Sequence, residues 1–217
     1  MKKLWVFGDS YSAPFSEIGI NAKNYEILKG YQPKVYCDFI SEKLGICGYN
    51  FAKGGLDNYS ILNMLCDKVD DIKDDDIIII GWSSPTRFRI AIQQSGLKDK
   101  WVSLVPGHID EWVNDYSNVF INRGYSNLYW QEVISWSKLI NKKFKNQIIH
   151  FSPFAFDDSP VPKNWIIDGI KIETIKKETN GKISDRHYSE NGHEYLADLF
   201  VAKIKNNKTE TDKKNLI

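Results

Sequence analysis

Four short segments of this sequence carry the residue types that acyl transfer requires. They supply a hydroxyl, backbone amides beside glycines, an amide side chain, and an imidazole next to a carboxylate: Gly8-Asp9-Ser10, Gly54-Gly55-Leu56-Asp57-Asn58, Gly81-Trp82-Ser83-Ser84 and Asp185-Arg186-His187. A serine hydroxyl attacks a carbonyl only when a base takes its proton, and histidine suits that task because its ordinary pKa is about 6.5. A carboxylate orients the imidazole and stabilises the imidazolium that forms. We therefore expect Ser10 as nucleophile, His187 as base and Asp185 as the orienting acid.

The elements that must position these segments are predicted from runs of apolar residues. Residues 3–7 read as a buried strand that stops at Gly8, and residues 46–52 read as a second strand that ends before Gly54. The four consecutive isoleucines at 77–80 indicate a central parallel strand that is buried on both faces. Ligands bind at the carboxyl ends of the strands in open parallel sheets. The four segments are therefore expected to converge on one edge of the sheet.

Between the predicted strands, apolar residues recur at helical spacing. This spacing predicts helices over 34–44, from 58 or 60 to 69, over 126–144 and over 190–204, with another strand at 147–151. Alternating strands and helices favour an α/β fold with a mostly parallel sheet that is covered on both faces. Residues 86–125 and 154–181 are too long for plain connections, and we expect them to form walls of the site. A single domain over 1–205 and a flexible tail over 206–217 follow from this pattern.

Composition excludes several classes of function. The chain has 217 residues and a net charge of +1, which gives no reason to expect nucleic acid or a membrane as partner. Its three cysteines show no CxxC spacing, so neither a disulfide framework nor a zinc site is expected. The four apolar residues after Met1-Lys2-Lys3 are too few for a signal peptide, which predicts a cytoplasmic location. The chemistry of the four segments requires no metal or cofactor.

The order and spacing of these segments resemble the conserved blocks of the SGNH (GDSL-like) hydrolase superfamily. Gly8-Asp9-Ser10-Tyr11-Ser12 is similar to the first block, Gly55 to the glycine of the second, and residues 185–193 to the last. The resemblance covers about residues 4–204. It implies a three-layer α/β/α, flavodoxin-like fold with Ser10 as nucleophile. It also implies that the backbone amides of Ser10 and Gly55 donate hydrogen bonds to the oxyanion.

Two positions depart from the superfamily pattern. The aspartate of the last block commonly stands three residues before the histidine, where this chain has Ser184; Asp185 stands two before. The third block commonly reads Gly-x-Asn, and the asparagine donates to the oxyanion, whereas here Ser83 stands in its place. Asn58 could supply the missing amide donor, or Ser83 or Ser84 could supply a hydroxyl. Without either, the oxyanion site would be weak and the reaction slow.

Other residues near the predicted strand ends have more ordinary roles. Asp9 is expected to cap the turn that follows it and to hold the loop. Arg87 could clamp an anionic or sugar substrate, or form a structural ion pair. His193 and His150 are expected to be structural, and the acidic turn at 74–76 is expected to be a solvated loop.

These observations favour a serine esterase that acts on a small-molecule or glycan ester. The resemblance makes O-acetyl groups on a carbohydrate a plausible substrate class. The missing third-block asparagine motivates one alternative, a glycan-binding or structural protein with weak catalysis, such as a component of a phage virion. A second alternative is an O-acyltransferase that uses the same triad with a sugar hydroxyl as acceptor. The oligomeric state stays open.

Overall fold

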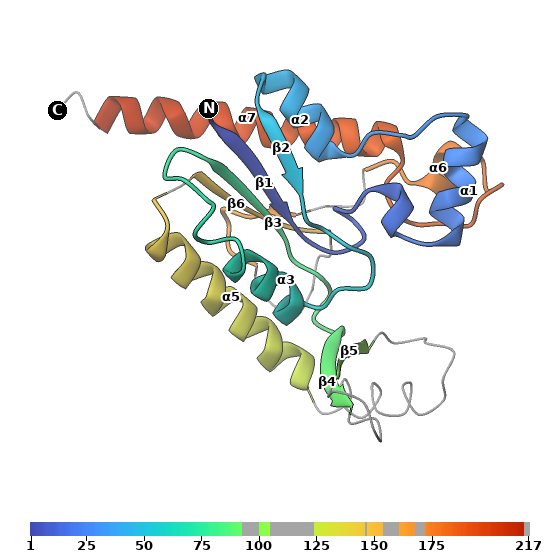
Figure 1. Ribbon diagram of the computed structural model, residues 1–217, viewed down its shortest axis with the longest axis horizontal. Helices are drawn as coiled ribbons and strands as arrows, with labels where there is room; N and C mark the ends of the chain where they lie inside the picture. The colour runs from blue at the N-terminus through green and yellow to red at the C-terminus, as the bar shows by residue number, and fades with distance from the viewer. Residues whose placement is uncertain (93–99, 105–123, 146, 154–160, 168–171, 215–217) are drawn as a thin grey trace.

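The structure, a computed structural model, describes residues 1–92, 100–104, 124–145, 147–153, 161–167 and 172–214. Its described part centres on a parallel sheet that lies between two layers of helices (Figure 1). The strand order is β2-β1-β3-β6-β7, with bounds Cys47–Asn50, Lys3–Phe7, Ile77–Gly81, Gln147–Ser152 and Ile166–Ile167. All neighbouring strands in this sheet pair in parallel. The three-layer α/β/α fold that the sequence predicted is confirmed.

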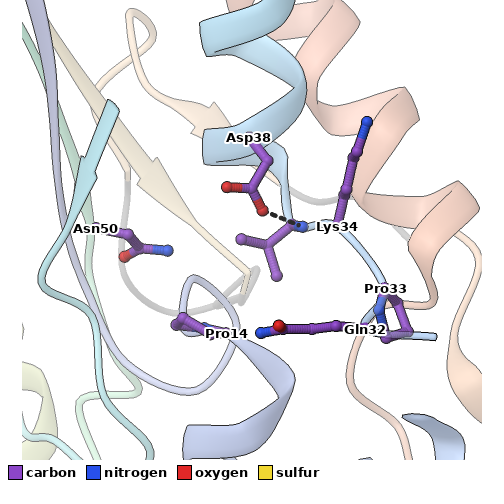
Figure 2. A pocket seen from close by; sticks show the side chains of 7 residues that line it. Pro14, Gln32, Pro33, Lys34, Asp38 and Asn50 are labelled. Carbon is purple, nitrogen blue, oxygen red and sulfur yellow. Dashed lines mark hydrogen bonds between the residues drawn. The ribbon is translucent and has the colours of Figure 1, made fainter. Parts of the chain in front are cut away.

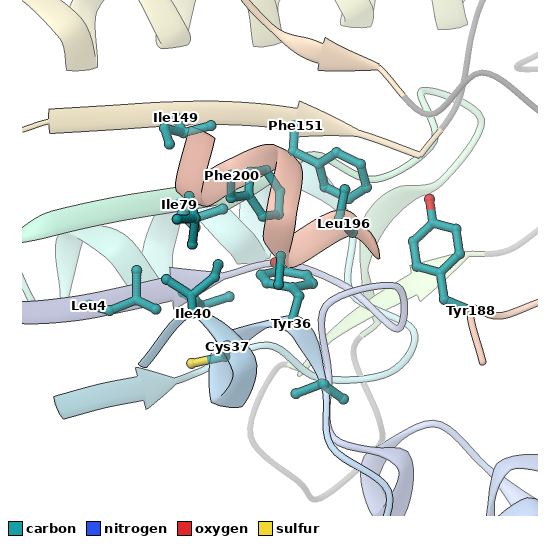
Figure 3. Packing of buried hydrophobic residues seen from close by; sticks show 14 of the residues in the cluster. Leu4, Tyr36, Cys37, Ile40, Ile79, Ile149, Phe151, Tyr188, Leu196 and Phe200 are labelled. Carbon is teal, nitrogen blue, oxygen red and sulfur yellow. The ribbon is translucent and has the colours of Figure 1, made fainter. Parts of the chain in front are cut away.

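Alternation along the strands divides the core into two clusters, one on each face of the sheet. On β1, Leu4 and Val6 point to one face, while Trp5 and Phe7 point to the other. The isoleucines of β3 alternate in the same way, and all four are buried. Figure 3 shows the first cluster, where β1, β3 and β6 meet α2 and α7. The continuous apolar run of β3 is therefore explained by helices on both faces.

Each helical layer covers one of these clusters. The layer over the first contains α1 (Ile20–Lys29), α2 (Tyr36–Leu44), the short α6 (Ile175–Glu178) and α7 (Glu190–Lys214). The layer over the second contains α3 (Asn58–Cys66) and α5 (Tyr125–Lys143). A 3₁₀ turn, η1 (Phe15–Glu17), connects the loop after β1 to α1. The loops that leave the sheet at the carboxyl ends of β1, β2 and β3 carry the candidate site.

The two long regions contain secondary structure that the sequence did not predict. An antiparallel hairpin of β4 (Phe88–Ile92) and β5 (Lys100–Leu104) lies in the first region. The second region supplies β7, which extends the sheet beside β6, and the whole of α6. Residues 93–99, 105–123, 154–160 and 168–171 lie outside the described residues. The prediction that both regions wall the site therefore stays a prediction.

The end of α7 differs from the sequence prediction. The helix was expected to stop near Ile204 and to give way to a flexible tail over 206–217, but α7 continues through Lys214. The sequence from His193 to Lys214 contains no glycine or proline, the two residues that most disfavour the backbone hydrogen bonds of a helix. Residues 215–217 lie outside the described residues. In the described part of the chain, no helix combines the length and the apolar character needed to cross a membrane.

Asp76 corrects the interpretation of the acidic turn as a solvated loop. Its side chain is fully buried and accepts a hydrogen bond from Trp5 Nε1 at 2.8 Å. It also accepts from the backbone amides of Lys3 at 2.8 Å and Lys73 at 3.0 Å. Burial raises the pKa of Asp76, but these donors outweigh it and hold that pKa below its ordinary value. The carboxylate therefore ties the start of β1 to the turn before β3.

An Asp76→Ala variant is expected to lower the free energy of unfolding by roughly 3 kcal/mol, because it leaves buried donors without an acceptor. The neighbouring Asp75 is exposed, so Asp75→Ala serves as the matched control. It should change that free energy by less than about 0.5 kcal/mol. Urea denaturation of both variants measures the difference. Equal, small effects in both variants would contradict a structural role for Asp76.

Candidate active site

Ser10, His187 and Asp185 form a hydrogen-bonded relay at the carboxyl edge of the sheet. His187 Nε2 lies 2.8 Å from Ser10 Oγ, and His187 Nδ1 lies 2.6 Å from Asp185 Oδ1. Ser10 follows β1, whereas the other two residues precede α7. The fold therefore brings together side chains that are 177 positions apart in the chain.

The protonation states follow from the partners of each ring nitrogen. Burial raises the pKa of Asp185, but hydrogen bonds from the side chain and backbone amide of His187 outweigh it and lower that pKa below its ordinary value. An ionised carboxylate only accepts hydrogen bonds, so Nδ1 of His187 carries the proton. Nε2 is then left as an acceptor for the Ser10 hydroxyl. This is the arrangement in which the imidazole can take the hydroxyl proton.

Asp185 stands two residues before His187, whereas the aspartate of the superfamily commonly stands three residues before the histidine. The local geometry shows how Asp185 can take its place. Its Oδ1 accepts both the ring Nδ1–H of His187 and the His187 backbone amide, the latter at 2.8 Å. A side chain that bonds to the amide two residues later closes a local turn. That turn directs the carboxylate and the imidazole toward each other. The two-residue spacing is thus compatible with a triad.

Hydrogen bonds to α6 fix the backbone of this turn. The carbonyl of His187 accepts from the amide of Ile175 at 2.9 Å, and the carbonyl of Asp185 accepts from the amide of Lys176 at 2.8 Å. On the other side, the Tyr11 ring lies 4.9 Å from the His187 ring, centroid to centroid. Tyr11 stands next to the predicted nucleophile in the chain, and no separate role was predicted for it. The imidazole is therefore held between α6 and the nucleophile loop.

The turn around Ser10 is organised by Asp9, as the sequence predicted. The amide of Tyr11 donates to Asp9 Oδ1 at 3.0 Å, and the amides of Ser12 and Ala13 donate to the Asp9 carbonyl, each at 3.0 Å. Gly8 is required just before this turn, since a Cβ there would lie 2.5 Å from Ser12 Oγ. Asp9 is 1% exposed, which makes it a buried carboxylate directly beside Ser10.

Gly55 lies in the loop between β2 and α3 with a φ of 79°, a conformation that favours glycine. The preceding Gly54 approaches the backbone of η1 so closely that a Cβ would lie 2.4 Å from the Glu17 carbonyl oxygen. Within the part of the chain that the structure describes, the backbone amides of Gly55 and Ser10 have no hydrogen-bond partner. Both remain available to a ligand.

Asn58 and Ser83 meet at the same edge, but their polar groups bond to protein atoms. Asn58 Nδ2 donates to the Ser83 carbonyl at 3.1 Å, and Asn58 Oδ1 accepts from the Ser83 amide at 2.7 Å. Ser83 Oγ donates to Asp9 Oδ2 at 2.8 Å. Both side chains are fully buried. In this arrangement they connect the start of α3 and the loop after β1 to the loop after β3. Ser84 Oγ bonds to Thr86 Oγ1 at 2.8 Å.

Arg87 also contacts protein acceptors. Its Nη1 donates to Asp9 Oδ2 and to the Leu56 carbonyl, each at 3.2 Å. The structure shows the ion pair with Asp9, and the role as a substrate clamp stays a prediction.

The remaining described histidines lie outside the relay. His150 Nδ1 accepts from Trp82 Nε1 at 3.1 Å, and its Nε2 lies 3.2 Å from Asn141 Oδ1. His193 is fully buried among aromatic rings in the first turn of α7. The expectation that both are structural agrees with these contacts.

A polar pocket of about 280 Å³ lies beside β2 and the start of α2 (Figure 2). Its lining includes Pro14, Lys34, Asp38 and Asn50, and none of the three relay residues. It touches the back of the nucleophile loop, because Asn50 Nδ2 donates to the Ser12 carbonyl at 2.8 Å. The pocket is therefore not the place where a substrate would meet Ser10.

Comparison with protein-family models gives no match for this chain, and comparison with curated proteins also gives none. Among solved structures, the chain is similar to "a putative lipolytic protein of G-D-S-L family" from Desulfitobacterium hafniense DCB-2. The two share 11% sequence identity with a TM-score of 0.39, over 91% of this chain and 97% of the other. A likeness at this level carries no argument about activity, which rests on the geometry of the site.

Proposed function

We propose that this protein is a serine esterase of the SGNH kind, with Ser10 as nucleophile, His187 as base and Asp185 as the orienting acid. One observation carries the proposal: an unbroken relay from the Asp185 carboxylate through both nitrogens of His187 to Ser10 Oγ, with joining distances of 2.6 and 2.8 Å. The position of the relay at the carboxyl ends of parallel strands supports it further, since substrates bind at that edge in open α/β sheets.

The reaction proceeds through a covalent acyl-enzyme. Ser10 Oγ attacks the ester carbonyl carbon while its proton passes to His187 Nε2. The backbone amides of Ser10 and Gly55 donate to the oxyanion of the tetrahedral intermediate. Collapse breaks the bond to the alcohol, which leaves with the proton from His187. Water then attacks the acyl group with His187 again as base, which releases the acid and restores Ser10.

The substrate class that we propose is an ester of a carbohydrate. The superfamily resemblance favours O-acetyl groups on a carbohydrate, with simple esters as an accessible first test. Two backbone amides, those of Ser10 and Gly55, are the proposed oxyanion donors; one N–H of Asn58 Nδ2 bonds to the Ser83 carbonyl, and the Ser83 hydroxyl bonds to Asp9. The esterase is expected to work without the third donor that the superfamily commonly has.

The testing experiment follows p-nitrophenyl acetate turnover and the mass of the intact protein together. Wild-type protein should release p-nitrophenol and carry an acetyl group on Ser10 after rapid acid quenching. Ser10→Ala should do neither. The matched control is Ser84→Ala, because Ser84 is also a serine near a strand end but bonds to Thr86, and this variant should keep wild-type turnover. Wild-type turnover no greater than that of Ser10→Ala, with no adduct, would refute the esterase.

A further inference from the structure

The buried carboxylate beside the nucleophile depends on Arg87 for its counter-charge. Asp9 is 1% exposed, and its Oδ2 accepts from Ser83 Oγ at 2.8 Å and from Arg87 Nη1 at 3.2 Å. The Arg87 side chain is itself only 14% exposed. A buried carboxylate without a paired cation is strongly unfavourable, and removing one partner of such a pair leaves the other uncompensated. Arg87 therefore places a cation next to the buried carboxylate that organises the Ser10 turn.

The same nitrogen of Arg87 reaches a second loop. Nη1 carries two N–H groups, and its second acceptor is the Leu56 carbonyl at 3.2 Å. Leu56 directly follows Gly55, whose amide is the second proposed oxyanion donor. One guanidinium nitrogen thus joins the loop after β1 to the loop after β2, and it does so from the segment after β3.

Other contacts hold the loop after β2 on the side that precedes Gly55. The amide of Lys53 donates to the Gly8 carbonyl at 3.2 Å, and the amide of Gly54 donates to the Glu17 carbonyl at 3.1 Å. Both anchors lie before Gly55, whereas the Arg87 contact at Leu56 lies directly after it. Arg87 therefore holds the backbone directly after Gly55, and Asn58, whose side chain bonds to the Ser83 backbone, holds the chain two residues further on.

We infer that Arg87 is a positioning residue. By bridging Asp9 and Leu56, it holds the backbone amides of Ser10 and Gly55 at the relative positions that an oxyanion requires. The inference rests on the proposed function for its catalytic consequence. In this role Nη1 bonds to Asp9 and Leu56, whereas a substrate clamp would bond to the ligand. The segment after β3 lacks the asparagine that commonly donates to the oxyanion. In this role it contributes Arg87 instead, which positions the two backbone donors. Preorganised donors stabilise an oxyanion because they do not reorganise during the reaction.

The kinetic test compares Arg87→Ala with Arg89→Ala. Arg89 is the matched control, because it lies two residues away and its guanidinium stacks over the Tyr59 ring at 5.1 Å. For Arg87→Ala, kcat with p-nitrophenyl acetate is expected to fall about 10²-fold, the typical cost of one lost oxyanion donor, with KM nearly unchanged. Millimolar guanidinium ion should restore part of kcat, while sodium chloride at equal ionic strength should not. Arg89→Ala should retain wild-type kcat.

A second measurement does not depend on activity. Hydrogen–deuterium exchange should become faster at residues 8–12 and 53–57 in Arg87→Ala, and should be unchanged there in Arg89→Ala. If Arg87→Ala fails to fold, Arg87→Lys keeps the charge and takes its place in both measurements.

Two outcomes would overturn this role of Arg87, and a third concerns the esterase activity alone. A raised KM with unchanged kcat and unchanged exchange would overturn the inference in favour of a substrate clamp. Faster exchange over the whole chain without rescue by guanidinium would overturn it in favour of a general structural role. An inactive wild type would refute the esterase alone, and exchange would still decide whether Arg87 holds the two loops.

Discussion

Replacing Asp185 with alanine is expected to slow ester hydrolysis by about 10⁴-fold, the typical cost of losing the acid of such a triad. Replacing it with asparagine is expected to cost much less, about 10–10²-fold. The reason is that a single oxygen, Oδ1, accepts both the His187 backbone amide and the His187 ring Nδ1–H. The backbone amide requires an acceptor, so it keeps the carboxamide oxygen of an asparagine in the same place. His187 then keeps its tautomer, and only the negative charge is lost; a hydrogen bond to a charged group contributes about 1.5–3 kcal/mol, against about 1 kcal/mol for a neutral pair.

The measurement is kcat/KM for p-nitrophenyl acetate in both Asp185 variants, with circular dichroism to verify folding. The ratio between the two variants is the informative quantity, because both lack the charge and only one lacks the acceptor. Equal losses would contradict the shared-oxygen geometry, since the asparagine would then present its amide group to the imidazole. Wild-type activity in Asp185→Ala would remove Asp185 from the relay.

The sequence predicted the sheet well because its strands are marked by local pattern. The isoleucine run of β3 is continuous, and its alternate residues pack on opposite faces as a central strand requires. By contrast, α1 was missed because its apolar residues do not form one buried stripe. Ala22 and Tyr25 are its buried residues, while Ile20 and Ile27 are exposed. A helix with apolar residues on both faces has no clear period to detect.

Sequence order also indicated which residues would meet at the site, but it did not show which of their atoms would bond. Asn58 and Ser83 both have groups that could face an oxyanion, and nothing in the sequence shows that the Asn58 side chain bonds to the Ser83 backbone. The signal that could have been used is Asp9, because a carboxylate that follows a buried strand needs donors and a cation. Four arginines occur in the chain, and Arg87 is the first to follow the neighbouring strand β3.

The free energy of unfolding is expected to fall at pH values above those at which carboxylates are protonated. The reason is that two buried histidines resist protonation in the native state. Burial lowers the pKa of His193 from 6.5 to about 3, with the charge of His187 as a smaller cause. Burial, together with the charge of Lys203, lowers the pKa of His150 from 6.5 to about 4. The unfolded chain binds these protons near pH 6.5 and the native state does not. Stability is therefore complete above about pH 6.5 and falls as the pH drops toward the native-state values.

His193 alone should remove about 3 kcal/mol between about pH 6.5 and 4, since one pH unit corresponds to about 1.4 kcal/mol for each differential proton. Urea denaturation at steps across this range measures the slope. His193→Leu has a side chain of similar volume that does not titrate, so its curve should be flatter than that of the wild type. Parallel curves would show that His193 is not responsible.

The environment of His193 also predicts the effect of this substitution at neutral pH. Among the described residues, neither of its ring nitrogens has a hydrogen-bond partner, and the rings of Phe15, Tyr36 and Tyr188 surround it. Leucine would bury no unpaired polar atom, which offsets the cost of repacking. The free energy of unfolding of His193→Leu at about pH 8 is thus expected to lie within about 1 kcal/mol of the wild type. Because the substitution would leave the contacts of His187 with the nucleophile and the acid intact, esterase activity at that pH should be retained while acid stability improves.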